Sequence, residues 1–340
     1  MTSEMELICP NLSSIPPSWY TKSSFSIGFL TIFTGLYAVF LIVKYSPASF
    51  RQFKWYLLAY QISSSVATIS ASILVVPVIL YPGPIASSRG LLNYMNIPLY
   101  TQILLDVGLH VAFGAIILIL FIYRHAVLNK IDPTSVRFKS YCFLFFVGAC
   151  SLYCVIGAGS NSEGEKVFTR EELVKQCPEL EEWDCSEDRL VLLSPYLMKN
   201  RLIPAIFVLQ FVLYSISLVY MALFIFKFCD THSCMSIRTR KMQMNLLLTL
   251  TLQASIPFIL ITLIMTICIV AYTFQFAWTG FSCAILFLIC ECNGIATAFS
   301  LILVNDAYRN EVKQILLRTV KYLVRLMQTH RYSYEKHVVI

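Results

Sequence analysis

Charged residues are scarce in this sequence. Asp, Glu, Lys and Arg make up 13% of its 340 residues, whereas hydrophobic residues make up 57%. Soluble domains carry about 25% charged and about 45–50% apolar residues. The composition therefore excludes a water-soluble globular protein and favours a chain that uses lipid as its solvent.

The motifs that carry enzyme chemistry are also missing. The sequence contains no HExxH, GxSxG or CxxC string, and its five histidines are scattered. The polar, glycine-containing segment 159–164 lacks the lysine that a phosphate-binding loop requires. We therefore expect neither an active site nor a cofactor nor a metal centre.

Seven long apolar runs are present, and a helix needs about 20 such residues to cross a bilayer. The runs are residues 24–43, 55–80, 98–123, 141–157, 203–226, 246–271 and 276–304. Transmembrane barrel strands are shorter and alternate in polarity, so they do not fit. We predict an all-α membrane protein, a bundle of seven transmembrane helices. Residues 1–23 would precede the 24–304 bundle, and residues 305–340 would form a tail.

Basic residues are distributed unevenly around these runs. Eighteen of the 26 Lys and Arg residues flank one side, whereas the opposite side holds ten acidic residues in the long loop 158–201 alone. Basic residues concentrate on the cytoplasmic side of membrane proteins, so we expect the amino terminus outside and the tail inside. Asn11-Leu12-Ser13 is a glycosylation sequon on the predicted external side. The net charge of +7 therefore comes from basic residues on the cytoplasmic side of the membrane, and it indicates no nucleic-acid partner.

Three cysteines lie in segments predicted to be external: Cys9, Cys177 and Cys185. An oxidising compartment permits one disulfide among them. We favour a link from Cys9 to one of the two loop cysteines, because it would hold the amino terminus over the bundle. The alternative is a local link between Cys177 and Cys185.

Polar residues inside the apolar runs are costly and therefore informative. Asp106 and His110 are four residues apart in the third run, so they share one helix face. They are candidate ligand contacts, or alternatively hydrogen-bonding groups that only join helices. Glu291 lies in the seventh run, where we expect it nearer the cytoplasmic half. It is either a buried switch or, slightly favoured, a structural polar contact.

Two prolines interrupt the runs and predict kinks. Pro77 lies near the end of the second run and Pro257 in the middle of the sixth, with Gln253 one turn before it. Gln253 can satisfy backbone groups that the kink at Pro257 exposes. A kinked sixth helix would be a natural moving part.

The inner ends of two runs carry paired aromatic and basic residues. Arg124 follows Tyr123 at the end of the third run, and Tyr308 precedes Arg309 after the seventh. Arg124 either joins the inner ends of neighbouring helices or anchors its helix at the lipid headgroups.

Beyond residue 304, apolar residues recur at helical spacing with Lys and Arg between them. They are Val312, Ile315, Leu316, Val320, Leu323 and Val324. This pattern predicts a helix on the anionic inner leaflet, or alternatively a helix that binds a partner.

Several strings resemble those of nematode serpentine chemoreceptors, and their order is more specific than any single string. They are CP at 9–10 with PSWY at 17–20, SPASFRQFKWYLLAYQ at 46–61, VVPVILYP at 75–82, YRH at 123–125, LQASIP at 252–257 and NDAYR at 305–309. Together with seven spans they are similar to the G-protein-coupled receptor plan. The closest likeness is to serpentine receptor classes I and H of the Str superfamily, and the opening strings favour class I.

The resemblance implies a chemosensory receptor in the plasma membrane of sensory neurons or their cilia. It would bind a small chemical cue and act through a heterotrimeric G protein. For such a receptor, the candidate residues for activation and G-protein coupling are Arg124, Gln253, Pro257, Glu291 and Tyr308. Asp106 suggests a basic cue, whereas an apolar pocket suggests a volatile one.

The chain departs from the rhodopsin pattern at three places. The outer end of the third run has no cysteine, YRH at 123–125 replaces DRY, and NDAY at 305–308 replaces NPxxY. A ligand-gated channel or small-solute transporter of seven spans is the alternative function. The predicted orientation disfavours the channel, and the lack of an internal repeat disfavours the transporter.

Overall fold

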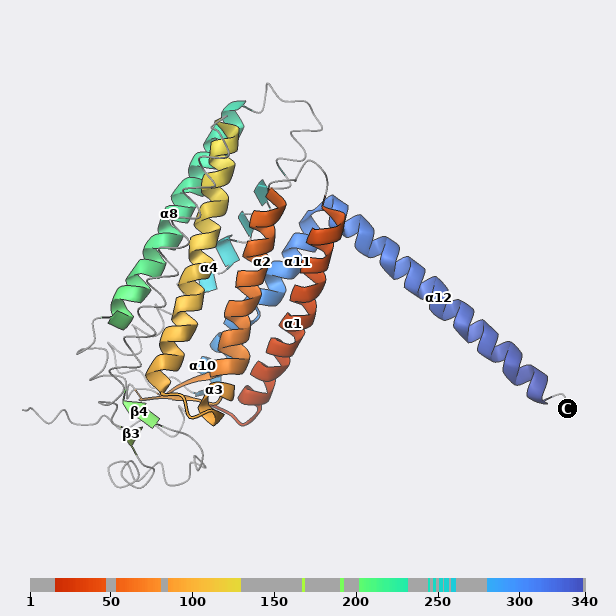
Figure 1. Ribbon diagram of the computed structural model, residues 1–340, viewed down its shortest axis with the longest axis horizontal. Helices are drawn as coiled ribbons and strands as arrows, with labels where there is room; N and C mark the ends of the chain where they lie inside the picture. The colour runs from red at the N-terminus through yellow and green to blue at the C-terminus, as the bar shows by residue number, and fades with distance from the viewer. Residues whose placement is uncertain are drawn as a thin grey trace, which may run out of the picture.

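Long helices dominate the computed structural model, which describes residues 16–46, 53–80, 85–129, 167–168, 190–192, 202–231 and 280–338, with scattered helical residues between 244 and 260. The helices α1 (Trp19–Tyr45), α2 (Phe53–Ile69), α4 (Leu99–Leu128) and α8 (Leu202–Thr231) form a bundle with α10 (Gly280–Glu291) and α11 (Asn293–Val304) (Figure 1). Within this bundle α4 packs between α2 and α8, and α11 packs against α1 and α2.

Four helices of the described residues are long and apolar enough to cross a membrane. They are Trp19–Tyr45, Phe53–Val75, Leu99–Val127 and Ala284–Val304, and α8 adds the shorter apolar stretch Phe211–Lys227. These helices correspond to the first, second, third, seventh and fifth predicted spans. The predicted fourth span, and most of the sixth, lie outside the described residues.

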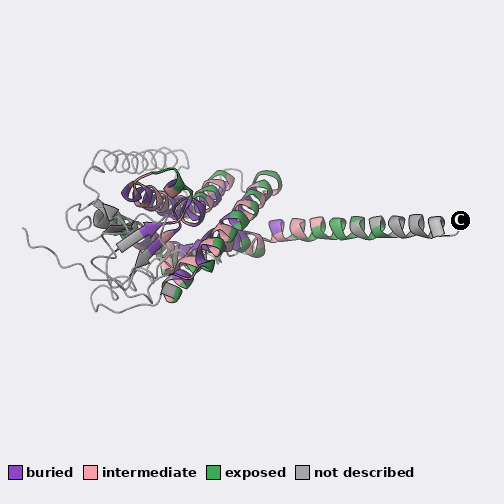
Figure 2. Cartoon of the chain, turned by 90° about the horizontal axis from the view of Figure 1, so that it is seen from below, coloured by how far each residue is buried: buried purple, intermediate pink, exposed green. Residues whose placement is uncertain are grey.

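Apolar side chains cover the outward surface of the helices as well as the core. On α1, Phe29, Phe33 and Leu36 are 56%, 69% and 64% exposed. Exposed stretches recur along the helices of the bundle (Figure 2). A soluble protein rarely leaves so much continuous apolar surface in water. The exposed surface therefore fits contact with lipid.

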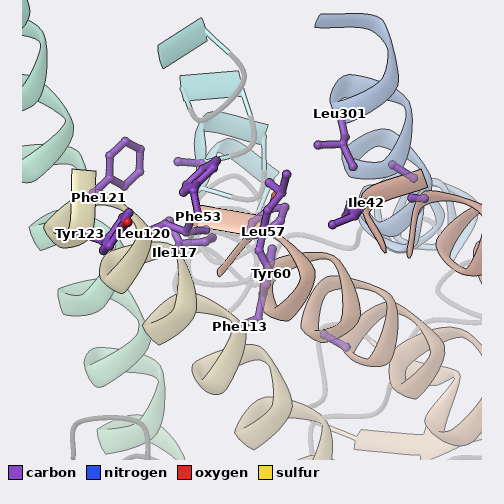
Figure 3. Packing of buried hydrophobic residues seen from close by; sticks show 14 of the residues in the cluster. Ile42, Phe53, Leu57, Tyr60, Phe113, Ile117, Leu120, Phe121, Tyr123 and Leu301 are labelled. Atoms are coloured by element: carbon purple, nitrogen blue, oxygen red, sulfur yellow. The ribbon is translucent and has the colours of Figure 1, made fainter. Parts of the chain in front are cut away.

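The main core lies between α2 and α4 and extends to α1 and α11. Phe53, Leu57 and Tyr60 of α2 meet Phe113 and neighbouring residues of α4 (Figure 3). All of these side chains are at most 3% exposed. This core fixes the position of α4, which carries the predicted polar pair near one end and Arg124 near the other.

Close approach of α11 to α1 and α2 depends on small residues. A Cβ on Gly294 would lie 2.7 Å from Thr31 Cγ2 and 2.7 Å from Thr68 Oγ1. Nearby, the hydroxyls of Ser64 and Thr297 are 3.0 Å apart. Small and hydroxylated residues let membrane helices pack closely, because lipid supplies no hydrophobic drive between them.

The outer end of the second span differs from the prediction. The helix does not continue to residue 80 with a kink at Pro77; it passes into the π-helix η3 (Ser70–Val75) and ends. Val76 adopts φ 45°, a left-handed conformation unusual for a β-branched residue. Proline disfavours helical geometry in the residue before it, so Pro77 begins the strand β1 (Pro77–Leu80) instead of kinking a helix.

A small antiparallel sheet lies at the end of the bundle that the charge pattern predicts to be external, called the outer end below. Its order is β1-β2-β4-β3, with β2 at Ile85–Ser88, β3 at Val167–Phe168 and β4 at Leu190–Leu192. Ala86 pairs with Val191, so the first external loop is joined to the long second one (Figure 1). Sequence analysis predicted no strand here. The chain then passes through the short helix α3 (Leu91–Tyr94) into α4.

The predicted tail helix is present as α12 (Asp306–Val338), which starts directly after α11 and extends away from the bundle (Figure 1). Its exposed apolar residues include Leu316, Leu317, Val320 and Val324. The tail is therefore helical in the structure. Its position on a membrane stays a prediction.

Candidate functional site

Asp106 and His110 lie on one face of α4, as their spacing predicts. His110 Nδ1 lies 2.9 Å from the Asp106 backbone oxygen, to which it donates, and 3.8 Å from Asp106 Oδ2. The side chains are 25% exposed for His110 and 19% for Asp106. The second carboxyl oxygen, Asp106 Oδ1, is buried and has no hydrogen-bond partner among the residues that the structure describes. The pair is thus partly accessible, and its carboxyl is only partly satisfied.

Glu291 ends α10 and lies deep between helices, with 3% of its surface exposed. Ser24, in the second turn of α1, donates to Glu291 Oε2 at 2.6 Å. The same hydroxyl is 3.1 Å from the backbone oxygen of Ser72 in η3. Both neighbours belong to the outer part of the bundle. The prediction that Glu291 lies nearer the cytoplasmic half is therefore wrong.

The two carboxyl groups belong to one cluster. Ser24 connects Glu291 with the Ser72 carbonyl of η3. The same π-helix carries Ser70 and packs against α4, which carries Asp106, and the charge of Asp106 acts on Glu291. Ser70 is fully buried, and its oxygen has no partner in good hydrogen-bonding geometry. Ser24, Ser70, Asp106, His110 and Glu291 are called the outer polar cluster below.

Two irregular backbone segments form this cluster. Ser70 opens the π-helix η3, and Glu291 stands directly before Cys292, where α10 ends and α11 begins. Single π-helical turns in α-helices occur frequently at functional sites. Regular helices on both elements would rotate these side chains differently, so the irregular backbone is what brings them together.

Arg124 lies at the inner end of α4 and is buried, with 6% of its surface exposed. Its guanidinium carbon is 3.5 Å from the centroid of the Phe53 ring. Arg124 Nε and Nη2 have no hydrogen-bond partner among the described residues. The ring of Tyr123, the preceding residue, stacks on Phe53 with 6.3 Å between ring centroids. Arg124 thus joins α4 to α2, and it does not reach out to lipid headgroups.

Tyr308 connects the start of α12 with the inner end of α1. It is fully buried, and its hydroxyl lies 2.8 Å from Ser46 Oγ. Burial raises the pKa of Tyr308, and the hydrogen bond with Ser46 partly offsets the rise. Asn305 caps the new helix by accepting from the Ala307 amide at 3.2 Å. The residues that replace NPxxY therefore build the junction between α11 and α12.

Other predicted residues lie outside the described part of the chain. They are Gln253 and Pro257 of the sixth span, the cysteines Cys9, Cys177 and Cys185, and the sequon residue Asn11.

Sequence reasoning missed Ser24, Ser70 and Phe53. Serine is common in membrane helices, where its hydroxyl can bond to its own helix backbone, so a lone serine gives little signal. One clue was present, because the second run is unusually rich in serine between residues 63 and 72. Phe53 gave no signal, since a phenylalanine at a helix end needs no special explanation.

The chain matches a family of known proteins over most of its length. The family model described as serpentine type 7TM GPCR chemoreceptor Srh matches residues 16–318. No curated protein matches the chain significantly. The likeness to serpentine chemoreceptors is confirmed, whereas the preference for class I over class H is wrong.

Proposed function

The chain belongs to the Srh family of serpentine seven-transmembrane chemoreceptors, and from this we propose that it binds a small chemical cue outside the cell and activates a heterotrimeric G protein inside it. Its family is one of receptors and not of enzymes. The observation that carries the proposal is the placement of two polar sites on one helix. Near its outer end α4 carries Asp106, and near its inner end it carries Arg124.

At the outer end, the cue contacts Asp106 and His110. These side chains remain partly accessible while the rest of their cluster is buried. A ligand shifts a receptor only by binding one of its arrangements more tightly than another. Contacts that join α4 to α10 through Asp106 and Glu291 would provide this difference, because they depend on how the two helices are placed.

At the inner end, Arg124 is the coupling residue. Its Nε and Nη2 groups, which have no partner within the described ranges, can donate to a backbone carbonyl or carboxylate of a partner protein. In the present arrangement Phe53 covers the guanidinium. Movement of the sixth helix about Pro257, supported by Gln253, would open the inner face, and the Tyr308 junction would adjust with it.

The plasma membrane of sensory neurons or their cilia is the proposed location. The tail helix α12 would lie on the inner leaflet. Exposed apolar residues such as Leu316 and Val320 alternate there with Lys313, Arg318 and Lys321. Each basic residue near an anionic leaflet contributes about 1 kcal/mol of attraction.

An Arg124→Ala variant tests the proposal. We expect it to reach the cell surface and bind a cue but to lose G-protein activation, measured as a calcium or cAMP response in cells screened with candidate cues. Arg309→Ala is the matched control, because Arg309 also lies at the inner end but is half-exposed and paired with Asp306. It should keep its response.

Two results would contradict the proposal. Intact signalling by Arg124→Ala would exclude Arg124 as the coupling residue. A cue-evoked current in cells that lack G-protein signalling would instead favour a ligand-gated channel.

A further inference from the structure

We propose that the outer polar cluster binds a protonated amine, whose positive charge lies between Asp106 and Glu291. This inference rests on the proposed receptor function, because it names the chemical class of the cue. It differs from the sequence prediction in two respects: Glu291 becomes a ligand contact, and η3 becomes part of the site.

The first step concerns charge. Two carboxyl groups lie within electrostatic reach of each other, and Glu291 is almost wholly buried. Among the described residues, no lysine or arginine forms an ion pair with either carboxyl. Among those residues, the basic side chain within 4 Å of Asp106 is His110, whose Nδ1 hydrogen already points at a backbone oxygen. The cluster is therefore short of positive charge.

The second step counts hydrogen-bond donors. The Ser24 hydroxyl has one proton but lies within bonding distance of two acceptors, Glu291 Oε2 and the Ser72 carbonyl oxygen. Asp106 Oδ1, Glu291 Oε1 and Ser70 Oγ are buried, and within the described part of the chain none of them has a partner in good hydrogen-bonding geometry. Each unsatisfied buried group destabilises the fold, because it has lost its hydrogen bonds to water without gaining others. A primary ammonium brings three N–H donors and one positive charge, which are the two things that the cluster lacks.

The third step distinguishes an amine from a metal ion. Among the described residues, no group of three or more His, Cys, Asp or Glu side chains could hold a metal. The cluster also has one accessible end, at Asp106 and His110, and one buried end, at Glu291. Such a shape suits a ligand whose charged group reaches the buried end and whose remaining atoms lie at the accessible end.

The body of this ligand would meet apolar surface. On α4, Ile103 and Leu109 lie three residues before and after Asp106, on the same helix face, and both are half-buried. A small alkylamine is volatile when neutral and cationic when protonated. It therefore satisfies both the basic and the volatile character that the sequence suggested.

A binding experiment on the purified full-length receptor in lipid nanodiscs tests the site. The probes are n-alkylammonium chlorides from methyl to hexyl, with alcohols of equal chain length and sodium chloride for comparison. We expect at least one ammonium to raise the melting temperature saturably, while its alcohol and sodium chloride do not. Asp106→Asn and Glu291→Gln should each weaken the apparent affinity at least about tenfold, since each removes a charge-assisted hydrogen bond.

Glu311→Gln is the matched control, because it makes the same substitution on α12, far from the cluster, and should leave the affinity unchanged. Both test substitutions keep side-chain shape. Should one of them fail to yield folded receptor, the other and Ser70→Ala still decide the result.

Four results would overturn the inference. They are equal stabilisation by ammonium and alcohol, stabilisation by sodium chloride alone, unchanged affinity in both carboxyl variants, and no effect of any ammonium in the series.

A signalling assay separates this inference from the proposed function. A cue that activates both variants as strongly as wild type overturns the amine site alone. An ammonium that binds but never activates a G protein supports the site and counts against the receptor proposal.

Discussion

Among single residues, Arg124 has an unusual neighbour for a buried charge. Buried cations normally need a carboxylate or several hydrogen bonds. Here the described residue that faces the guanidinium is Phe53, with the ring centroid 3.5 Å away. A desolvated cation–π contact contributes about 2 kcal/mol. Phe53 therefore holds Arg124 against α2 in the arrangement that the structure shows.

Replacing Phe53 by leucine should raise signalling in the absence of any cue. Leucine keeps apolar bulk but removes the aromatic face, so Arg124 is released more easily. A loss of about 1–2 kcal/mol shifts a two-state equilibrium by roughly fivefold to thirtyfold. G-protein activation without ligand, normalised to receptor at the cell surface, measures the change.

Trp55→Leu is the control for this prediction. Trp55 lies on the same helix turn as Phe53 but is 64% exposed and faces Lys54. Its loss should leave basal signalling unchanged. Equal basal activity in Phe53→Leu and wild type would show that the ring does not restrain Arg124.

Among elements, the close contact of α11 with α1 and α2 makes Gly294 sensitive. A methyl group there would meet the β-branched side chains of Thr31 and Thr68 at 2.7 Å. Gly294→Ala should therefore destabilise the receptor by about 1–3 kcal/mol, as overpacking usually does. The melting temperature of purified receptor should fall accordingly.

Gly114 provides a matched comparison on α4. An added Cβ would lie 3.6 Å from the Tyr214 ring, which is ordinary van der Waals contact. Gly114→Ala should change the free energy of unfolding by no more than about 0.5 kcal/mol. If both variants melt at the same temperature, close packing of α11 does not limit stability.

For these elements, the sequence predicted only features that depend on residues close together in the chain. Apolar runs predicted the described spans, and four-residue spacing placed Asp106 beside His110. By contrast, Ser24 and Glu291 are 267 positions apart, and the pairing of Ala86 with Val191 joins two different loops. Such contacts depend on how helices and loops assemble, which no local pattern encodes. The end of the second helix was missed because Pro77 was treated as a kink inside a helix when it begins a strand.

Across the whole molecule, the two ends of the bundle differ in chemistry. One end carries the four-stranded sheet and the outer polar cluster, and the other carries Arg124 and the junction of α11 with α12 (Figure 1). Basic residues flank the second end, and acidic residues are concentrated in the loop at the first. This asymmetry predicts that the sheet faces the outside of the cell, because positive charge is retained in the cytoplasm.

Epitope tags on the full chain test this orientation. A tag at the amino terminus should be stained by antibody in intact cells, whereas a tag after Ile340 should be stained only after the membrane is permeabilised. Ser13→Ala should remove a glycan from Asn11 and increase mobility on a gel, since the sequon needs its hydroxyl residue. Its mobility should match that of wild type treated with glycosidase. Staining of the carboxyl-terminal tag in intact cells would reverse the orientation, and Arg124 would then lie on the wrong side of the membrane to couple to a G protein.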